Sequence, residues 1–322
     1  MRRREFIALS GASITWPFGA LAQEPGRTYR IGCLQPVPRD VPGLLAFFDG
    51  LRSFGFIKGQ NLTVDFRDYG AHIDLISKFA TDLVNARVDA IQAAGDPAIY
   101  AAQQATKTIP ILGFTDDMAG AGFVTSMARP TGNITGVSLL ATELDGKRQE
   151  ILIEAVPGVS RMAVLAPNTA APAKLDALKA AARARNVELS IYQIGSGEEI
   201  APAIDQAQAS GAMALNVLSS PILYFGRRLI MDRVATMRMP TIYQWPEQAE
   251  EGGFIGYGPS VTQISREISA RLLAKVLRGT KVADIPVEQP TKFELVINLK
   301  TAKAMGVTVP EALLVRADKV IE

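Results

Sequence analysis

The feature that most constrains the fold is an alternation of strand-like and helix-like segments, which begins at Tyr29 and restarts halfway along the chain. The strand-like segments are short, apolar and rich in β-forming residues. The first set comprises 29–34, 62–67, 88–93 and 109–114, and the second comprises 162–166, 187–194, 212–218 and 241–243. Repeated strand–helix–strand units form parallel sheets with helices on both faces. Because the second set starts anew after the Gly- and Pro-containing run 128–136, we expect an α/β protein with two similar Rossmann-like lobes; an eightfold barrel is the alternative.

The segments between the strands have helical character. In 72–86, apolar residues recur on one face of a helix, and further helices are expected at 173–185 and 222–237. Asp96 followed by Pro97 predicts a helix that begins there, with Asp96 as its N-cap.

The C-terminal segment 254–322 is too short for a third domain. It contains a helical pattern over 262–277 and a strand-like segment over 293–298, and we expect it to pass back across the lobes. Two or three connections between the lobes are the arrangement that a hinge needs. The predicted units are residues 28–137 with 258–288 for one lobe, and 138–257 with 289–322 for the other.

The first 22 residues have the features of an export signal. Three arginines, Arg2 to Arg4, precede a mostly apolar stretch, and Ala20-Leu21-Ala22 fits the small-x-small rule for cleavage. The order Arg3-Arg4-Glu5-Phe6 is a partial match to the twin-arginine export route. A membrane anchor is the alternative, but the apolar run is short and is interrupted by Pro17. We therefore expect a soluble protein exported to a bacterial periplasm.

The charge balance argues against a nucleic-acid partner. Without Arg2, Arg3, Arg4 and Glu5 of the N-terminal segment, 31 basic and 31 acidic residues remain. Binding to a phosphate backbone needs concentrated positive charge. The neutral remainder therefore predicts no nucleic-acid partner.

The residues that catalysis or cofactor binding would need are scarce. The chain has one histidine, His72, and one cysteine, Cys33, so a zinc site is not expected. No Gly-x-Ser-x-Gly elbow is present, and Gly195-Ser196-Gly197 lacks the third glycine of a dinucleotide-binding loop. We expect no metal and no cofactor.

Three stretches carry a resemblance to a known family. They are 50–61, with Gly50-Leu51-Arg52-Ser53-Phe54-Gly55-Phe56 and Gly59-Gln60-Asn61, then 128–137, "ARPTGNITGV", and 286–310, "PVEQPTKFELVINLKTAKAMGVTVP". They resemble the substrate-binding proteins of ABC importers, in the group that includes tryptophan and tyrosine binders. The resemblance implies a two-lobed periplasmic-binding fold of type 1 with three crossovers, a small-molecule ligand and a permease partner at the inner membrane.

The chain departs from the family pattern at Thr131-Gly132, where two glycines are common, and at Asp117-Met118-Ala119, where Asp-Pro-Val is common. The second departure leaves the ligand undetermined.

Ligands of open α/β sheets lie beyond the carboxyl ends of the strands, so the candidate site residues are those that follow each strand. They are Gln35, Gly95, Asp96, Thr115, Asp116, Asp117 and Ser138 in the first set, and Asn168, Thr169, Ser219, Ser220, Tyr243, Trp245 and Tyr257 in the second set. We expect 94–96 and 219–220 to bind polar groups and the aromatic residues to supply apolar area. Asp96 could instead serve only as a helix cap, and Trp245 could pack in the core. Short polar groups beside aromatics favour a small amphipathic ligand, such as an amino acid or an aromatic acid.

Three functions agree with these features. The first is a monomeric periplasmic receptor that delivers its ligand to a permease, and the second is a ligand-sensing subunit of a signalling partner. The third is an exported enzyme that uses Asp116 and Asp117. Adjacent strand residues point to opposite faces, so both acids reach one substrate only if the turn bends them together. We expect one of them to hold a ligand's ammonium or hydroxyl group and the other to cap the turn.

Overall fold

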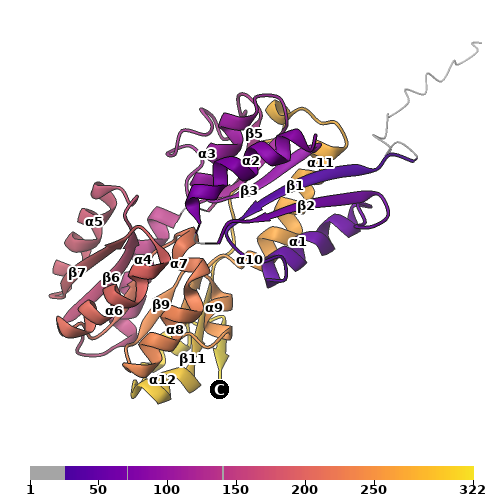
Figure 1. The fold of residues 1–322 in the computed structure, drawn as a ribbon. Coiled ribbons are helices and arrows are strands. Elements are labelled where there is room, and N and C mark those ends of the chain that lie inside the picture. Colours follow the sequence, from indigo (N-terminus) through magenta and orange to yellow (C-terminus); the bar gives the residue numbers. More distant parts are fainter. Residues whose placement is uncertain (1–25, 71, 140) are drawn as a thin grey trace, which may run out of the picture.

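The computed structural model describes residues 26–70, 72–139 and 141–322 of the chain, so the expected export signal lies outside the described residues. Two lobes are visible, each built on a mostly parallel sheet that is covered by helices (Figure 1). This arrangement confirms the two Rossmann-like lobes and excludes the single barrel. Among the described residues, no helix is long and apolar enough to cross a bilayer.

The first sheet has five parallel strands in the order β2-β1-β3-β4-β5. Its strands are β1 (Tyr29–Gln35), β2 (Leu62–Asp68), β3 (Ala90–Ala94), β4 (Ile111–Thr115) and β5 (Ile134–Ser138). Its helices are α1 (Pro42–Ser53), η1 (Ile73–Leu75), α2 (Ile76–Asn85) and α3 (Asp96–Ala105). Neighbouring residues such as Cys33 and Leu34 belong to different core clusters, one on each face of the sheet. Both faces are therefore covered, as the apolar strands predict.

A later part of the chain completes this lobe. It comprises α10 (Val261–Gln263), a π-helical stretch η3 (Ile264–Ser269), α11 (Ala270–Leu277) and η4 (Val282–Asp284). The π-helical stretch packs against α1 at Gly50, where a Cβ atom would lie only 2.4 Å from the carbonyl oxygen of Arg266. The close approach requires glycine at that position. The predicted helix over 262–277 is thus present, although it is not α-helical throughout.

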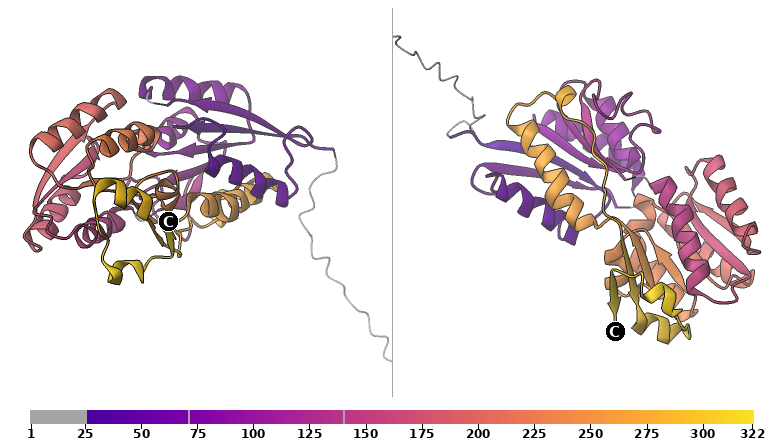
Figure 2. Two further views of the ribbon diagram at one scale, coloured as in Figure 1. Left: turned by 90° about the horizontal axis from the view of Figure 1, so that it is seen from below. Right: turned by 180° about the vertical axis from the view of Figure 1, so that it is seen from behind.

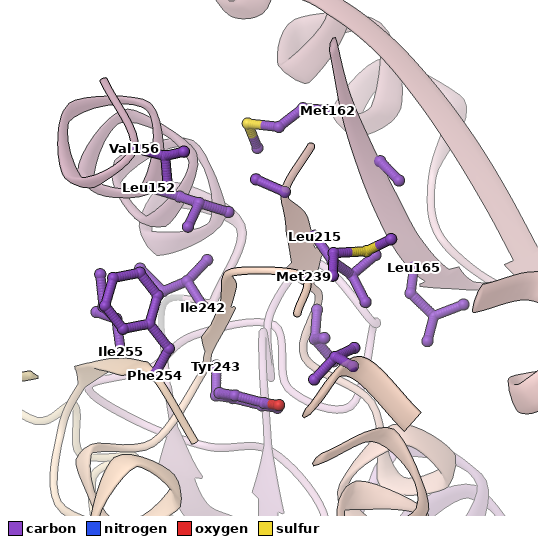
Figure 3. Close-up of a cluster of buried hydrophobic side chains, with 14 of the residues drawn as sticks. Leu152, Val156, Met162, Leu165, Leu215, Met239, Ile242, Tyr243, Phe254 and Ile255 are labelled. Carbon is purple, nitrogen blue, oxygen red and sulfur yellow. The ribbon is translucent and has the colours of Figure 1, made fainter. Parts of the chain in front are cut away.

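The second sheet has seven strands in the order β12-β11-β10-β9-β8-β6-β7. Its strands are β6 (Arg161–Pro167), β7 (Glu188–Ile194), β8 (Leu215–Val217), β9 (Thr241–Tyr243), β10 (Ile255–Gly258), β11 (Glu294–Asn298) and β12 (Lys319–Ile321). Its helical segments are α4 (Ala141–Ala155), α5 (Pro172–Arg183), η2 (Gly197–Glu199), α6 (Ile200–Ala209), α7 (Pro221–Phe225), α8 (Arg227–Thr236), α9 (Pro246–Glu250), α12 (Leu299–Met305) and α13 (Glu311–Leu314). Figure 3 shows Leu152 and Val156 of α4 beside Met162, Ile242 and Phe254 in the core of this lobe.

Two expectations for this lobe need correction. The predicted helix 222–237 is divided at Gly226 into α7 and α8. The sheet is not wholly parallel, because β10 pairs with β11 in antiparallel orientation. The chain leaves the lobe at the end of β10, passes through α10 and α11, and re-enters at β11 from the same edge. It must therefore run in the opposite direction beside β10 (Figure 2, rear view).

The chain passes between the lobes three times, after β5, after β10 and before β11. The helix α3 begins one residue earlier than predicted, with Gly95 as N-cap (φ +86°) and Asp96 as the first helical residue. Gly95 provides the positive φ that turns the chain directly from β3 into α3. Asp96 is therefore not the N-cap, and its carboxylate is used elsewhere.

Candidate functional site

The carboxyl ends of the two sheets meet, and the helix α7 lies at their boundary (Figure 1). The Ser219 hydroxyl, which follows β8, donates a hydrogen bond to Asp116 Oδ1, which follows β4, at 2.6 Å. At Gly95, an added Cβ would lie 2.5 Å from Cγ of Pro221 in α7. At Gly70, it would lie 3.3 Å from the ring of Phe225. The lobes are therefore in direct contact at this boundary, an arrangement that we term closed.

Asp116 carries the contact from the first lobe. The residue is half-buried, and desolvation raises the pKa of its carboxyl to about 6. The Ser219 hydrogen bond and the charge of Lys174 oppose this rise in pKa, whereas the charges of Asp145 and Asp96 add to it. Asp116 thus titrates near neutrality and faces the opposite lobe.

Asp117 has a different function from its neighbour. Its side chain is exposed, and its Oδ1 accepts a hydrogen bond from the Gly120 N–H at 2.8 Å. It therefore caps its own turn, as expected for one of the two acids. The two carboxylates therefore have different partners, the Gly120 N–H for Asp117 and the Ser219 hydroxyl for Asp116.

The other candidate residues of the first lobe are paired within that lobe. The Thr115 hydroxyl donates to Asp96 Oδ1, and burial raises the pKa of Asp96. Gln35 donates to Gln92 Oε1, and both side chains are buried. The Ser138 hydroxyl accepts a hydrogen bond from the Met118 N–H at 3.1 Å. These contacts hold the strand ends and the 116–120 turn in place around Asp116.

The candidate residues of the second lobe fall into three groups. Ser219 and Ser220 are buried at the contact between the lobes. Asn168 and Thr169 are exposed at the edge formed by β6. Tyr243 is fully buried in the core of this lobe (Figure 3), and the ring of Tyr257 packs against that core. Among the fourteen candidates, the structure thus brings Asp116 and Ser219 into direct contact and sets Tyr243 apart from the boundary.

Trp245 belongs to the chain of the second lobe but packs with the core of the first. It is 5% exposed and clusters with Leu139 and Ile264. Its ring centroid lies 6.2 Å from that of Phe114 and 6.4 Å from that of Tyr224. Within the described residues, its Nε1 and the neighbouring Gln244 Oε1 are buried without a hydrogen-bond partner. The core-packing alternative for Trp245 therefore describes the observed position, and two polar atoms remain beside it.

A buried ionic cluster in the second lobe was missed by the sequence reasoning. Asp145 (0% exposed) accepts from Arg148 Nη1 at 2.6 Å, and its second oxygen contacts the Lys174 ammonium. Arg148 also donates to the carbonyl oxygens of Tyr257 (2.8 Å) and Gln244 (3.4 Å). The i,i+3 spacing of Asp145 and Arg148 is visible in the sequence, but such a pair normally marks an exposed helix face. Its burial became evident only in the fold.

Comparisons with known proteins agree with this architecture. Residues 40–321 match the family model described as ABC transporter substrate binding protein. A curated relative, the tyrosine-binding protein of Clostridioides difficile (strain R20291), is 28% identical over 265 residues, which are 80% of this chain and 75% of that protein.

Two solved structures share the fold. A conserved domain protein of Vibrio cholerae has a TM-score of 0.81 and 25% identity, with 91% of this chain and 100% of that chain covered. The ABC domain of Streptococcus pneumonia in complex with L-Trp has a TM-score of 0.79 and 23% identity, with the same coverage. The resemblance inferred from the sequence is confirmed: this chain belongs to the family of ABC transporter substrate-binding proteins.

Proposed function

We propose that this protein is the periplasmic receptor of an ABC importer, which binds an amino acid or a related aromatic carboxylate between its lobes and delivers it to an inner-membrane permease. The observation that carries the proposal is the Asp116–Ser219 hydrogen bond, which joins the carboxyl ends of the two sheets. A ligand that bridges both lobes binds the closed state better and shifts the population towards it. The closed state is then the form that the permease recognises.

The proposed site combines charge, hydroxyl groups and aromatic surface. Asp116 and Ser219 are its centre, with Ser220, Asp96 and Thr115 beside them. Phe114, Tyr224 and Trp245 form an aromatic group at the same boundary. The tyrosine-binding relative and the L-Trp complex support an aromatic amino acid as the ligand class. Tyr243, as a core residue, is not included in the proposed site.

The units that move are proposed to be residues 28–137 with 258–288 and residues 138–257 with 289–322. The three connections between the lobes would form the hinge. We assign the protein to the periplasm because its first 22 residues have the pattern of an export signal and its family consists of substrate receptors. One chain supplies both faces of the site, so a monomer suffices for binding.

The enzyme alternative receives less support from the geometry. Asp117 caps its own turn, and Asp116 is bonded to Ser219. The single histidine, His72, precedes η1 and is exposed. The sensor alternative requires the same closed state as the receptor and differs from it only in the partner, which is a signalling protein instead of a permease.

Calorimetric titration with the amino acids and with aromatic acids tests the proposed function, with sugars and nucleosides as the comparison set. We expect binding of an aromatic amino acid and, in X-ray scattering, a smaller radius of gyration with ligand than without it. The bound compound should be recovered unchanged by mass spectrometry. Binding of sugars or nucleosides alone, or conversion of the ligand to a product, would refute the proposal.

A further inference from the structure

We propose that Lys174 selects ligands that carry a carboxylate, and that Asp145 is the positioning residue that holds its ammonium group at the boundary between the lobes. The inference rests on the proposed function and adds to it the residue that receives the negative end of the ligand. It assigns a binding function to a residue outside the strand ends, at the start of α5.

The first argument is the charge balance of the buried cluster in the second lobe. The carboxylate of Asp145 contacts two cations, the Arg148 guanidinium and the Lys174 ammonium. Uncompensated buried charge is costly, so the surplus positive charge of this cluster requires an anion nearby. Asp116 of the opposite lobe is close enough for the Lys174 charge to lower its pKa. Above about pH 6, where Asp116 is ionised, its carboxylate supplies the balancing charge in the closed arrangement without ligand.

The second argument distinguishes the two cations. Arg148 is 2% exposed, and its three nitrogens donate to Tyr257 O, Asp145 Oδ1 and Gln244 O. The guanidinium is thus committed to the β9–α9 connection and to β10. Lys174 is 13% exposed, and its ammonium group, which carries three donors, contacts Asp145 Oδ2 as an ion pair. Lys174 is the cation that can turn towards a ligand while it keeps its partner.

The third argument concerns what a ligand does when it enters. A ligand held by Asp116 and Ser219 must separate the two side chains that now bond each other. An ammonium group on the ligand would pair with Asp116, which removes the anion that balances Lys174. A carboxylate on the same ligand restores the balance beside Lys174, whereas a purely cationic amine leaves the lysine uncompensated. The site therefore favours a zwitterion over the corresponding amine.

The test compares Lys174→Gln with Lys179→Gln, which removes an exposed lysine from the same helix with only a 3.9 Å contact to Asp176. The probes are L-tyrosine and L-tryptophan against tyramine and tryptamine, which lack the carboxylate. We expect Lys174→Gln to weaken binding of the amino acids about 10- to 100-fold, whereas binding of the amines should stay equal or become stronger because the uncompensated cation is removed. Lys179→Gln should leave all four affinities unchanged.

An equal loss for amino acids and amines in Lys174→Gln would show that Lys174 is only structural, and no loss at all would also overturn the inference. If that variant fails to fold, the affinities of the wild-type protein still test the inference, because equal affinity for tyrosine and tyramine contradicts it. A wild-type protein that binds none of the amino acids refutes the proposed function and the inference together. Binding of the amino acids with no effect of Lys174→Gln refutes the inference alone.

Discussion

Each lobe faces the other with the carboxyl ends of its sheet, but the charged side chains near these ends have opposite signs in the two lobes. The edge of the first lobe carries the carboxylates of Asp96 and Asp116, whereas the second lobe carries Lys174 and Arg148, which share Asp145. Parallel-sheet topology explains why the site lies at this place, since strand ends gather at one edge. It does not explain the charges. The difference between the lobes teaches that the charge at their boundary depends on side chains that the topology leaves undetermined.

The largest effect is expected when the charge cluster of the second lobe is broken. Arg148→Met removes the guanidinium that binds Asp145 and two backbone carbonyls, all of them buried. We expect a loss of about 3 kcal/mol in the free energy of unfolding, measured by urea denaturation. Arg233→Met, which removes an exposed ion pair with Asp205, should cost less than about 1 kcal/mol. Equal losses in the two variants would contradict a structural function for the cluster.

The contact between the edges can be blocked from the first lobe with Gly95→Ala. The new Cβ would lie 2.5 Å from Pro221, so the closed arrangement could not form without a shift of α7. Gly95 has φ +86° and ψ 150°, a region essentially restricted to glycine, so alanine there adds about 1–3 kcal/mol of backbone strain. Gly59→Ala is a matched control, because Gly59 has φ +82° and nothing within 4 Å of the added atom.

Both glycine variants should lose stability in thermal unfolding, because alanine is strained at a positive φ. Only Gly95→Ala should also weaken ligand binding in calorimetry, by about tenfold or more. If Gly95→Ala binds ligand as tightly as Gly59→Ala, closure at this contact is not required.

The ionisation of Asp116 should make both the closed contact and the ligand affinity depend on pH. Desolvation raises the pKa of Asp116 to about 6 in the closed protein, above its ordinary value of about 3.9. The closed contact without ligand is therefore most stable below about pH 4, and this stability is lost as the pH rises through about 6. Binding of an ammonium-bearing ligand needs the ionised carboxylate. The affinity should fall as the pH drops below about 6, by up to tenfold per pH unit.

Asp116→Asn should abolish this pH dependence in calorimetric titrations. Asp117→Asn, in the exposed turn, should retain it and should change stability by less than about 1 kcal/mol. A pH dependence that survives in Asp116→Asn would assign the titration to another group.

Most of the fold could be predicted from the sequence, because the strands of both sets are short apolar runs that end at polar residues. The strand β10 escaped this reasoning, since Gly252, Gly253, Gly256 and Gly258 make its surroundings look like a turn. Its antiparallel pairing with β11 depends on the path through the other lobe, which no local pattern records.

The site was predicted less completely for a related reason. Asp116 directly follows β4 and Ser219 lies two residues after β8, so the rule for strand ends named both residues of the contact between the lobes. Lys174, Asp145 and Arg148 lie on helices, and their burial depends on how α4 and α5 pack. Conversely, Tyr243 follows the strand pattern, but its side chain points into the core (Figure 3). The side of the sheet on which a residue falls is set by tertiary packing.

The insertion of Trp245 into the core of the opposite lobe has a spectroscopic consequence. The chain has two tryptophans, Trp16 and Trp245, and cleavage after residue 22 would remove the first. The mature protein would then have a single indole fluorophore, buried beside Phe114 and Tyr224 where the two lobes join. Its emission should be blue-shifted, as for an indole shielded from water, and should respond to closure without any attached dye. This indole would thus serve as an intrinsic optical probe of closure between the lobes.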